Sequence, residues 1–211
     1  MVEQLRIQEK LRRESRVLQI FQDLGVVRKA HFVFTSGLHS DTYLNKDLLY
    51  PHPLIVEEIC AMLASDFEQQ DIDVVAAPEK GGITLSNNIA RILTRKKGIE
   101  VLSIFAEKDE DDFRFGRGYE DLINGRRILL VEDNLTTGGS LRKVVNKIRM
   151  GGGIVVGATA ICNRGNVKPE DVGIQQLNSL LTLSLNHWPA LECPPCKNGV
   201  PINALGHGAK F

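Results

Sequence analysis

The sequence predicts an α/β fold in which a mostly parallel central sheet is flanked by helices. Short aliphatic runs alternate with longer stretches of helical periodicity between about residues 72 and 161. The aliphatic runs are nearly continuous, which is typical of parallel strands that are covered on both faces. One of these strands ends in two adjacent carboxylates and a glycine-rich turn. In sheets of this kind, ligands bind at the carboxyl ends of the strands.

The first fifty residues have a different pattern. Residues 3–24 are expected to form an amphipathic helix that stops at Gly25. Its apolar positions fall near helical spacing and are Leu5, Leu11, Leu18, Phe21 and Leu24. Residues 31–50 alternate around a Ser-Gly turn, which predicts a hairpin or an extended segment.

The rest of the chain supplies the sheet and its covering helices. Strands are expected at 72–77, 99–105, 127–133 and 153–161, and helices at 53–69, 82–96 and 139–150. The charged stretch 106–126 and the tail 186–211, which is rich in Pro, Gly, Asn and Cys, are expected to be mostly irregular. Residues 1–211 are interpreted as one domain, with a core at about 53–165 and a small hood from about 1–50 and part of 166–211.

Composition narrows the class of protein. The chain has 26 basic residues (Lys and Arg) and 26 acidic residues (Asp and Glu). It therefore has no overall basic field that would attract nucleic acid or an anionic membrane. No apolar run approaches the roughly 20 residues that cross a bilayer, and the charged N-terminus does not resemble a signal peptide. Four cysteines are too few for a disulfide scaffold, so a reducing, cytoplasmic setting is expected.

The turn after the strand at 127–133 is suited to bind a phosphate. It leads into a helix, whose first amides have no partner within the helix and whose dipole favours an anion. Its glycines allow close approach, and its hydroxyl groups add donors. The residues of this expected site are Asn134, Leu135, Thr136, Thr137, Gly138, Gly139 and Ser140. The pattern is neither a Walker loop nor a dinucleotide fingerprint.

Glu132 and Asp133 stand directly before this turn. Carboxylates beside a bound phosphate repel it, so acids at this position are expected to have a role of their own. They could bind sugar hydroxyls, hold Mg²⁺ or stabilise a developing cation. A ligand that places a phosphate at the turn and two neighbouring hydroxyl groups at the acids would be a ribose 5-phosphate. Taken singly, the acids could be a solvated strand end and the turn an ordinary helix cap, but together they favour a binding site.

The stretch ILLVEDNLTTGGS, residues 128–140, resembles the phosphoribosyl-pyrophosphate (PRPP) signature of the type I phosphoribosyltransferase family. The resemblance extends over roughly residues 15–165 and implies the type I fold. It also implies that Glu132 and Asp133 act in catalysis and that residues 134–140 hold the 5-phosphate.

The same resemblance implies a second loop, for pyrophosphate, after the strand at 72–77. Pro78 is expected to end that strand, and Lys80 and Gly81 lead into the next helix. Without the resemblance, a common strand–helix turn with a solvated lysine would be the better interpretation. Lys108 fits one lysine of the family's mobile catalytic loop.

Further segments of the sequence resemble motifs of the orotate phosphoribosyltransferase branch of the family. They imply that Tyr43 and Leu44 flank the base and that Arg164 reaches it, because a guanidinium suits the orotate carboxylate. Thr35 stands where that branch often has a lysine. The implied reaction transfers phosphoribose from PRPP to orotate with Mg²⁺, held mainly through PRPP with no firm protein ligand, and the implied assembly is a homodimer.

Alternatives stay open at this point. The chain could use another nucleobase, or it could be a regulatory protein that binds PRPP without turnover. Glu107 stands where the mobile loop usually has an arginine, and no histidine follows. Arg114 and Arg117 could supply the missing charge, or the loop could be merely solvated.

Cys193 and Cys196 form a single C-x-x-C pair in the tail. His187 and His207 could complete four metal ligands, but a structural role is the main interpretation and zinc the minor one. Cys60 and Cys162 are expected to be buried and inert.

Overall fold

The structure, a computed structural model, describes residues 2–34 and 37–203, with side chains from residue 4 onward. The chain divides into two compact units. Unit 1 contains residues 1–17 and 52–183, and unit 2 contains residues 18–51 and 184–211. Each unit is described by itself below.

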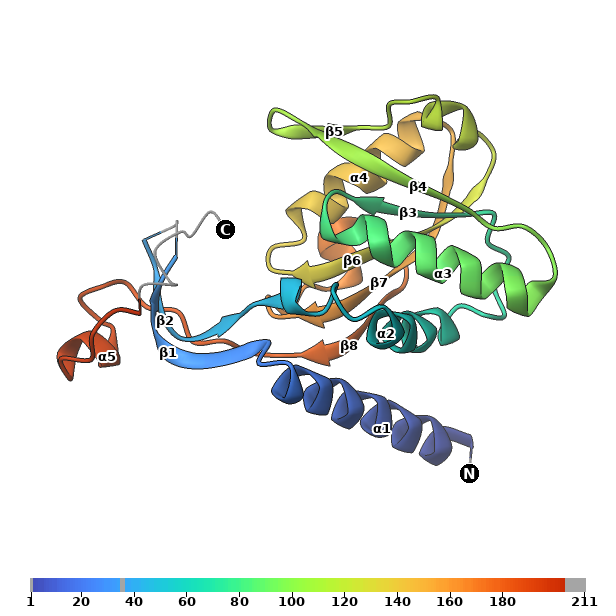
Figure 1. Cartoon of the computed structure of the whole chain (residues 1–211). Coiled ribbons are helices and arrows are strands. Elements are labelled where there is room, and N and C mark those ends of the chain that lie inside the picture. The colour runs from blue at the N-terminus through green and yellow to red at the C-terminus, as the bar shows by residue number, and fades with distance from the viewer. Residues whose placement is uncertain (1, 35–36, 204–211) are drawn as a thin grey trace. The chain divides into compact units, whose positions relative to one another are not determined.

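Unit 1 is built on a six-stranded sheet with the order β5-β4-β3-β6-β7-β8 (Figure 1). The strands are β3 (Val74–Pro78), β4 (Leu102–Asp109), β5 (Asp112–Arg114), β6 (Arg127–Leu135), β7 (Ile154–Asn163) and β8 (Leu177–Thr182). All neighbouring pairs are parallel except β4 and β5, which are antiparallel. The predicted mostly parallel sheet is therefore confirmed.

Helices cover both faces of this sheet, as Figure 1 shows. They are α2 (Pro53–Ser65), α3 (Gly81–Lys97) and α4 (Gly139–Met150), and α1 (Val2–Asp23) begins in the same unit. On one face, Leu141, Val144 and Ile148 of α4 pack against aliphatic side chains of β3, β6 and β7. Each fully buried aliphatic side chain contributes about 1.5–3 kcal/mol. In the described part of the chain, no helix is long and apolar enough to span a membrane.

The charged stretch after the second predicted strand is more ordered than expected. β4 begins at Leu102, three residues later than the predicted 99, and turns into β5 to form a hairpin. Phe113 and Phe115 are buried in the core of unit 1, whereas the side chain of Arg114 between them is exposed. This alternation in DFRF is a strand signal that the acidic composition of the segment obscured.

Other boundaries also differ from the prediction. β8 was missed because LNSLLT mixes polar and apolar residues, as suits an edge strand that is only partly buried. Helix α2 ends at Ser65 rather than 69. Pro78 does not break β3 but is its last residue and pairs with Ala106.

Unit 2 contains the predicted hairpin, formed by β1 (Val27–Val33) and β2 (His39–Leu44) in antiparallel pairing. Gly25, with φ +65°, ends α1 as expected. The tail is not wholly irregular, because it forms the short helix α5 (Pro194–Lys197) and isolated bridges to both hairpin strands.

Gly82 marks the closest approach of α3 to the sheet. A Cβ atom there would lie 2.6 Å from the Ala77 Cβ and 3.3 Å from the Val131 carbonyl oxygen. We expect Gly82→Ala to lower the free energy of unfolding by about 1–3 kcal/mol, the usual cost of overpacking. Urea unfolding measures this, with the exposed Thr84→Ala on the same helix as the control. Equal midpoints for both variants would show that the sheet adjusts without cost.

Candidate active site

The loop between β6 and α4 has the geometry of an anion site. Gly138 precedes α4 with φ +71° and is buried, and a Cβ atom there would lie 2.6 Å from the Val172 Cγ1. The first helical hydrogen bond runs from the Arg142 amide to the Gly138 carbonyl. The amides before Arg142 therefore lack partners within the helix, and that of Gly139 donates to the Thr137 hydroxyl at 3.3 Å.

A cavity of about 100 Å³ lies against this loop. Its lining consists of Glu132, Asn134, Leu135, Thr136, Thr137, Gly138, Gly139, Ser140 and Leu141. Pockets for whole drug-sized ligands measure about 300–1,000 Å³, so this cavity suits one small group such as a phosphate. The Asn134 Oδ1 is buried and has no hydrogen-bond partner within the described ranges. Rotation of that amide would aim an NH₂ donor at the same place.

Glu132 and Asp133 lie on opposite faces of β6, because successive strand side chains alternate. Glu132 lines the cavity at the α4 loop, whereas Asp133 is only 5% exposed and does not line it. Asp133 shares its face with Val131, whose carbonyl lies close to Gly82 of α3. The structure therefore directs one acid toward the α4 loop and the other toward the face covered by α3.

Lys80 lies in the loop between β3 and α3, and Lys108 lies near the end of the neighbouring strand β4, at the same edge of the sheet. Pro78 pairs with Ala106, so each lysine follows that pair by two residues. The Lys108 amide donates to the Glu79 carboxylate at 2.8 Å, which ties the loop before Gly81 to β4. Both lysine side chains are exposed. The Glu79–Lys80 peptide bond is cis.

Arg164 lies at the phosphate loop itself. Its Nε donates to the Thr136 hydroxyl at 2.8 Å. The next residue, Gly165, approaches so closely that a Cβ atom would lie 1.5 Å from the Thr136 carbonyl oxygen. Sequence reasoning missed Gly165, since the need for glycine arises from a contact between segments that are distant in the chain.

Glu107 in the charged hairpin is paired with two arginines of the same segment. Glu107 accepts a hydrogen bond from Arg117 Nε at 2.7 Å and lies 3.6 Å from the Arg114 guanidinium. The hydrogen bond to Glu107 raises the pKa of Arg117. The two arginines that could have replaced the missing cation of the mobile loop are thus both paired with the acid that stands in its place.

Tyr43 and Leu44 belong to unit 2, on β2. The Tyr43 ring lies 5.4 Å from the Phe32 ring and 6.5 Å from the Phe34 ring, measured between centroids. Tyr43 is half-buried, so part of this aromatic group faces solvent. Thr35 lies outside the described residues.

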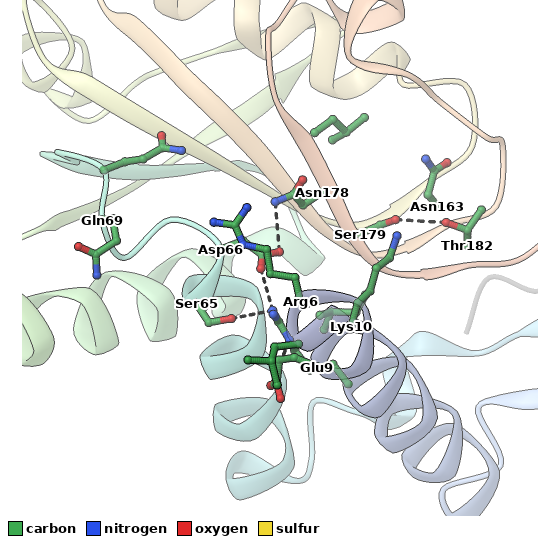
Figure 2. A pocket seen from close by; sticks show the side chains of 15 residues that line it. Arg6, Glu9, Lys10, Ser65, Asp66, Gln69, Asn163, Asn178, Ser179 and Thr182 are labelled. Carbon is green, nitrogen blue, oxygen red and sulfur yellow. Dashed lines mark hydrogen bonds and ion pairs between the residues drawn. The ribbon is translucent and has the colours of Figure 1, made fainter. Parts of the chain in front are cut away.

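A larger groove of about 980 Å³ runs between α1, the end of α2 and β8 (Figure 2). None of the site residues predicted from the sequence lines it. Its polar side chains pair with one another. Asn178 donates to the Asp66 carboxylate at 3.1 Å, as Figure 2 shows, and Arg13 lies 2.8 Å from the same carboxylate. The small cavity at residues 132–141 is therefore the stronger candidate site.

A mostly parallel sheet with a phosphate-sized cavity at the end of a central strand is the arrangement in which α/β proteins typically bind phosphorylated ligands. The model of the phosphoribosyl transferase domain matches residues 46–182. The chain therefore belongs to the phosphoribosyltransferase family, and it is an enzyme of the glycosyltransferase type. The match extends beyond residue 165, where the resemblance recognised in the sequence ended.

Individual relatives agree with this assignment. The orotate phosphoribosyltransferase of Caldanaerobacter subterraneus is 38% identical over 189 residues, which cover 90% of this chain and 95% of the relative. A crystal structure of the Mycobacterium tuberculosis orotate phosphoribosyltransferase with Fe(III) dicitrate has a TM-score of 0.65 and 20% identity, over 82% of this chain and 97% of the other. The same enzyme with PRPP has a TM-score of 0.54 and 22% identity, over 67% and 81% of the two chains.

The tight contact at Gly165 can be tested directly. Gly165→Ala must push the Arg164 segment away from Thr136, which disturbs the loop. If the disturbed loop loses one hydrogen bond to the charged phosphate of the ligand, binding weakens by about 1.5–3 kcal/mol. We therefore expect the affinity for ribose 5-phosphate to fall about tenfold or more.

Isothermal titration calorimetry measures this affinity. Asn166→Gly is the matched control, because φ at Asn166 is +50° and suits glycine. Unchanged affinity in a folded Gly165→Ala variant would contradict the role of this contact.

Proposed function

We propose that this chain transfers the 5-phosphoribosyl group from PRPP to orotate, which forms orotidine 5′-monophosphate and pyrophosphate. The observation that carries the proposal is the loop at residues 134–140, where helix amides and hydroxyl groups surround a phosphate-sized cavity beside Glu132. The relatives named above as orotate phosphoribosyltransferases support orotate as the acceptor. A solved relative that binds PRPP supports the donor.

The loop at 134–140 would hold the 5-phosphate of the ribose. The helix dipole alone contributes about 0.3–1 kcal/mol, so several amide and hydroxyl donors must act together. Each hydrogen bond to the charged phosphate adds about 1.5–3 kcal/mol. This grip lies away from the reacting carbon, and it therefore helps to align the sugar for the chemical step.

Lys80, Lys108 and the amides around Gly81 would bind the pyrophosphate of PRPP. Their neighbouring positions beyond Pro78 and Ala106 support a common role. Mg²⁺ would be held mainly through the pyrophosphate oxygens, where it would neutralise charge on the leaving group.

Glu132 and Asp133 would serve the ribose ring. As pyrophosphate leaves, positive charge develops on the ring, and nearby carboxylates favour it. Because Glu132 and Asp133 lie on opposite faces of β6, we infer that they have different roles. Glu132 would meet hydroxyl groups beside the 5-phosphate, and Asp133 would act from the face that is covered by α3.

The base would be recognised by Tyr43 and Leu44 of unit 2 and by Arg164. We infer that unit 2 corresponds to the hood of the family, with a flat pyrimidine against the half-buried tyrosine ring. Because Arg164 already binds Thr136, it would link the base to the phosphate loop. A homodimer in the cytoplasm completes the proposal.

The choice of base is tested by supplying PRPP and Mg²⁺ with orotate, uracil or a purine and following pyrophosphate release. We expect turnover with orotate only, because its carboxylate can pair with a guanidinium. Turnover with another base alone would assign a different acceptor. Binding of PRPP without release of pyrophosphate from any base would indicate a regulatory protein instead.

Asp133→Asn tests the role of the buried acid. The change preserves shape but removes charge, so we expect kcat to fall about 100-fold or more while PRPP affinity changes much less. Steady-state kinetics and calorimetry provide the two numbers, and the exposed Asp121→Asn serves as the control. Equal losses in kcat and in PRPP affinity would sink the role of Asp133 in the transition state.

A further inference from the structure

Four side chains of unit 2 converge on one point, and we call them the His₂Cys₂ cluster: His31, His39, Cys193 and Cys196. Their ligand atoms all lie within 4.8 Å of one another. His31 comes from β1, His39 begins β2, and the two cysteines flank the start of α5. Residues from two distant parts of the chain thus share one small volume.

The spacing of these atoms matches a tetrahedral metal site. Zn–N bonds of about 2.0–2.1 Å and Zn–S bonds of about 2.3 Å place N and S ligands about 3.5 Å apart. The His31 Nε2 lies 3.5 Å from each cysteine sulfur, and the His39 Nδ1 lies 3.3 Å from the Cys196 sulfur. The two ring nitrogens are 2.9 Å apart, somewhat closer than the roughly 3.3 Å that such a site sets.

The surroundings hold His31 in the tautomer that a metal needs. Its Nδ1 donates to the Val200 carbonyl at 2.7 Å, which leaves the Nε2 lone pair directed at the cluster. A histidine that ligates a metal typically donates its other N–H group in this way. The partner carbonyl comes from the same tail as the cysteines, so one segment supplies both the ligands and their support.

Backbone hydrogen bonds fix the same histidines from outside. The His39 amide donates to the Trp188 carbonyl at 2.8 Å, and the Trp188 amide donates back at 3.0 Å. The Asn203 amide donates to the His31 carbonyl at 2.7 Å. The tail therefore borders both strands of the hairpin, and the cluster lies where they meet.

Three of the four ligand side chains are buried, and the fourth, Cys196, is exposed. His31 is 2% exposed, His39 is 7% exposed and Cys193 is fully buried. Thiols are weak hydrogen-bond donors, so the contacts between the sulfur atoms and the ring nitrogens are weak as hydrogen bonds, whereas the same groups are strong ligands of a metal ion. Unit 2 also consists of two short segments, and small units that lack a large core commonly need a metal or a disulfide.

We propose that the His₂Cys₂ cluster binds one structural Zn²⁺ ion. Two thiolates and two imidazoles in tetrahedral order are a ligand set that zinc favours, and four protein ligands leave no open position for catalysis. Zinc here ties the tail to the β1–β2 hairpin. None of its ligands is a residue assigned to the proposed reaction, although His39 shares β2 with Tyr43 and Leu44.

The sequence analysis named the same two cysteines but considered other histidines, His187 and His207, as their partners. The His187 ring lies against the Phe34 ring, 5.4 Å away, and is not part of the cluster. His207 lies outside the described residues. His31 and His39 were missed because their approach to the cysteines depends on how the tail borders the hairpin.

The metal content of the full-length chain tests the proposal. The protein is produced with zinc in the medium, purified without chelators and analysed by inductively coupled plasma mass spectrometry. We expect about one zinc ion per chain. His31→Gln and Cys196→Ser should each lose most of this zinc, whereas His187→Gln, the matched control in the same unit, should retain it.

Cobalt keeps the test valid if those variants fail to fold. The wild-type chain, exchanged with Co²⁺, should show the intense visible bands of tetrahedral cobalt and the near-ultraviolet thiolate charge-transfer band. A spectrum of octahedral cobalt without thiolate bands would overturn the proposal. So would wild-type protein without zinc, or full zinc content in folded His31→Gln.

Thiol chemistry separates zinc from a disulfide. Burial raises the pKa of Cys60 and of Cys162 to about 12, so neither thiol reacts readily. We expect a chelator to release zinc from the wild type and to expose two alkylatable thiols, Cys193 and Cys196, without a reductant. Alkylation of these cysteines only after reduction would identify a disulfide and refute the zinc site.

Discussion

The amides at the start of α4, which have no partner within the helix, are the feature on which the candidate active site depends. They exist because β6 ends at the edge of a parallel sheet and the chain turns at once into a helix. Gly138 makes the turn possible, both through its positive φ and through its close contact with Val172. Gly165 lets a second segment press against the same loop and brings Arg164 to Thr136. In the proposed function these backbone amides bind the phosphate together with the hydroxyl groups of Thr136, Thr137 and Ser140, which are exposed.

Side chains alternate between the two faces of a strand, and this alternation separates the two acids beside the loop. Adjacent residues on β6 cannot face the same side, so Glu132 and Asp133 serve different neighbours. Glu132 joins the small cavity, and Asp133 joins the face on which α3 begins beside Lys80. The parallel pairing of β3 with β4 then places Lys108 beside that second loop. The proposed phosphate site and the two exposed lysines thus lie at one edge of the sheet, with one acid directed to each face.

Unit 2 is organised on a different principle. Its hairpin and tail bury few large side chains for their length, and the clearest convergence of groups in it is polar. A metal ion would bring these short segments together with few apolar contacts, whereas unit 1 relies on aliphatic packing across a sheet. The β4–β5 hairpin is stabilised in a third way. Two arginines pair with Glu107, and two phenylalanines are buried in the core of unit 1.

Much of unit 1 could be predicted from the sequence because its signals are local. Aliphatic runs, glycine turns and helical spacing located β3, β6, β7, α3 and α4 within a few residues, and the VEDNLTTGGS stretch predicted the loop at 134–140. Contacts between distant segments had no such signal. Only the tertiary structure could reveal β8 at the sheet edge, Gly165 against Thr136, the pairing of Arg114 and Arg117 with Glu107, and the two histidines beside the tail cysteines. The physical reason is that periodicity and turn chemistry act between neighbours along the chain, while these contacts depend on which surfaces folding brings together.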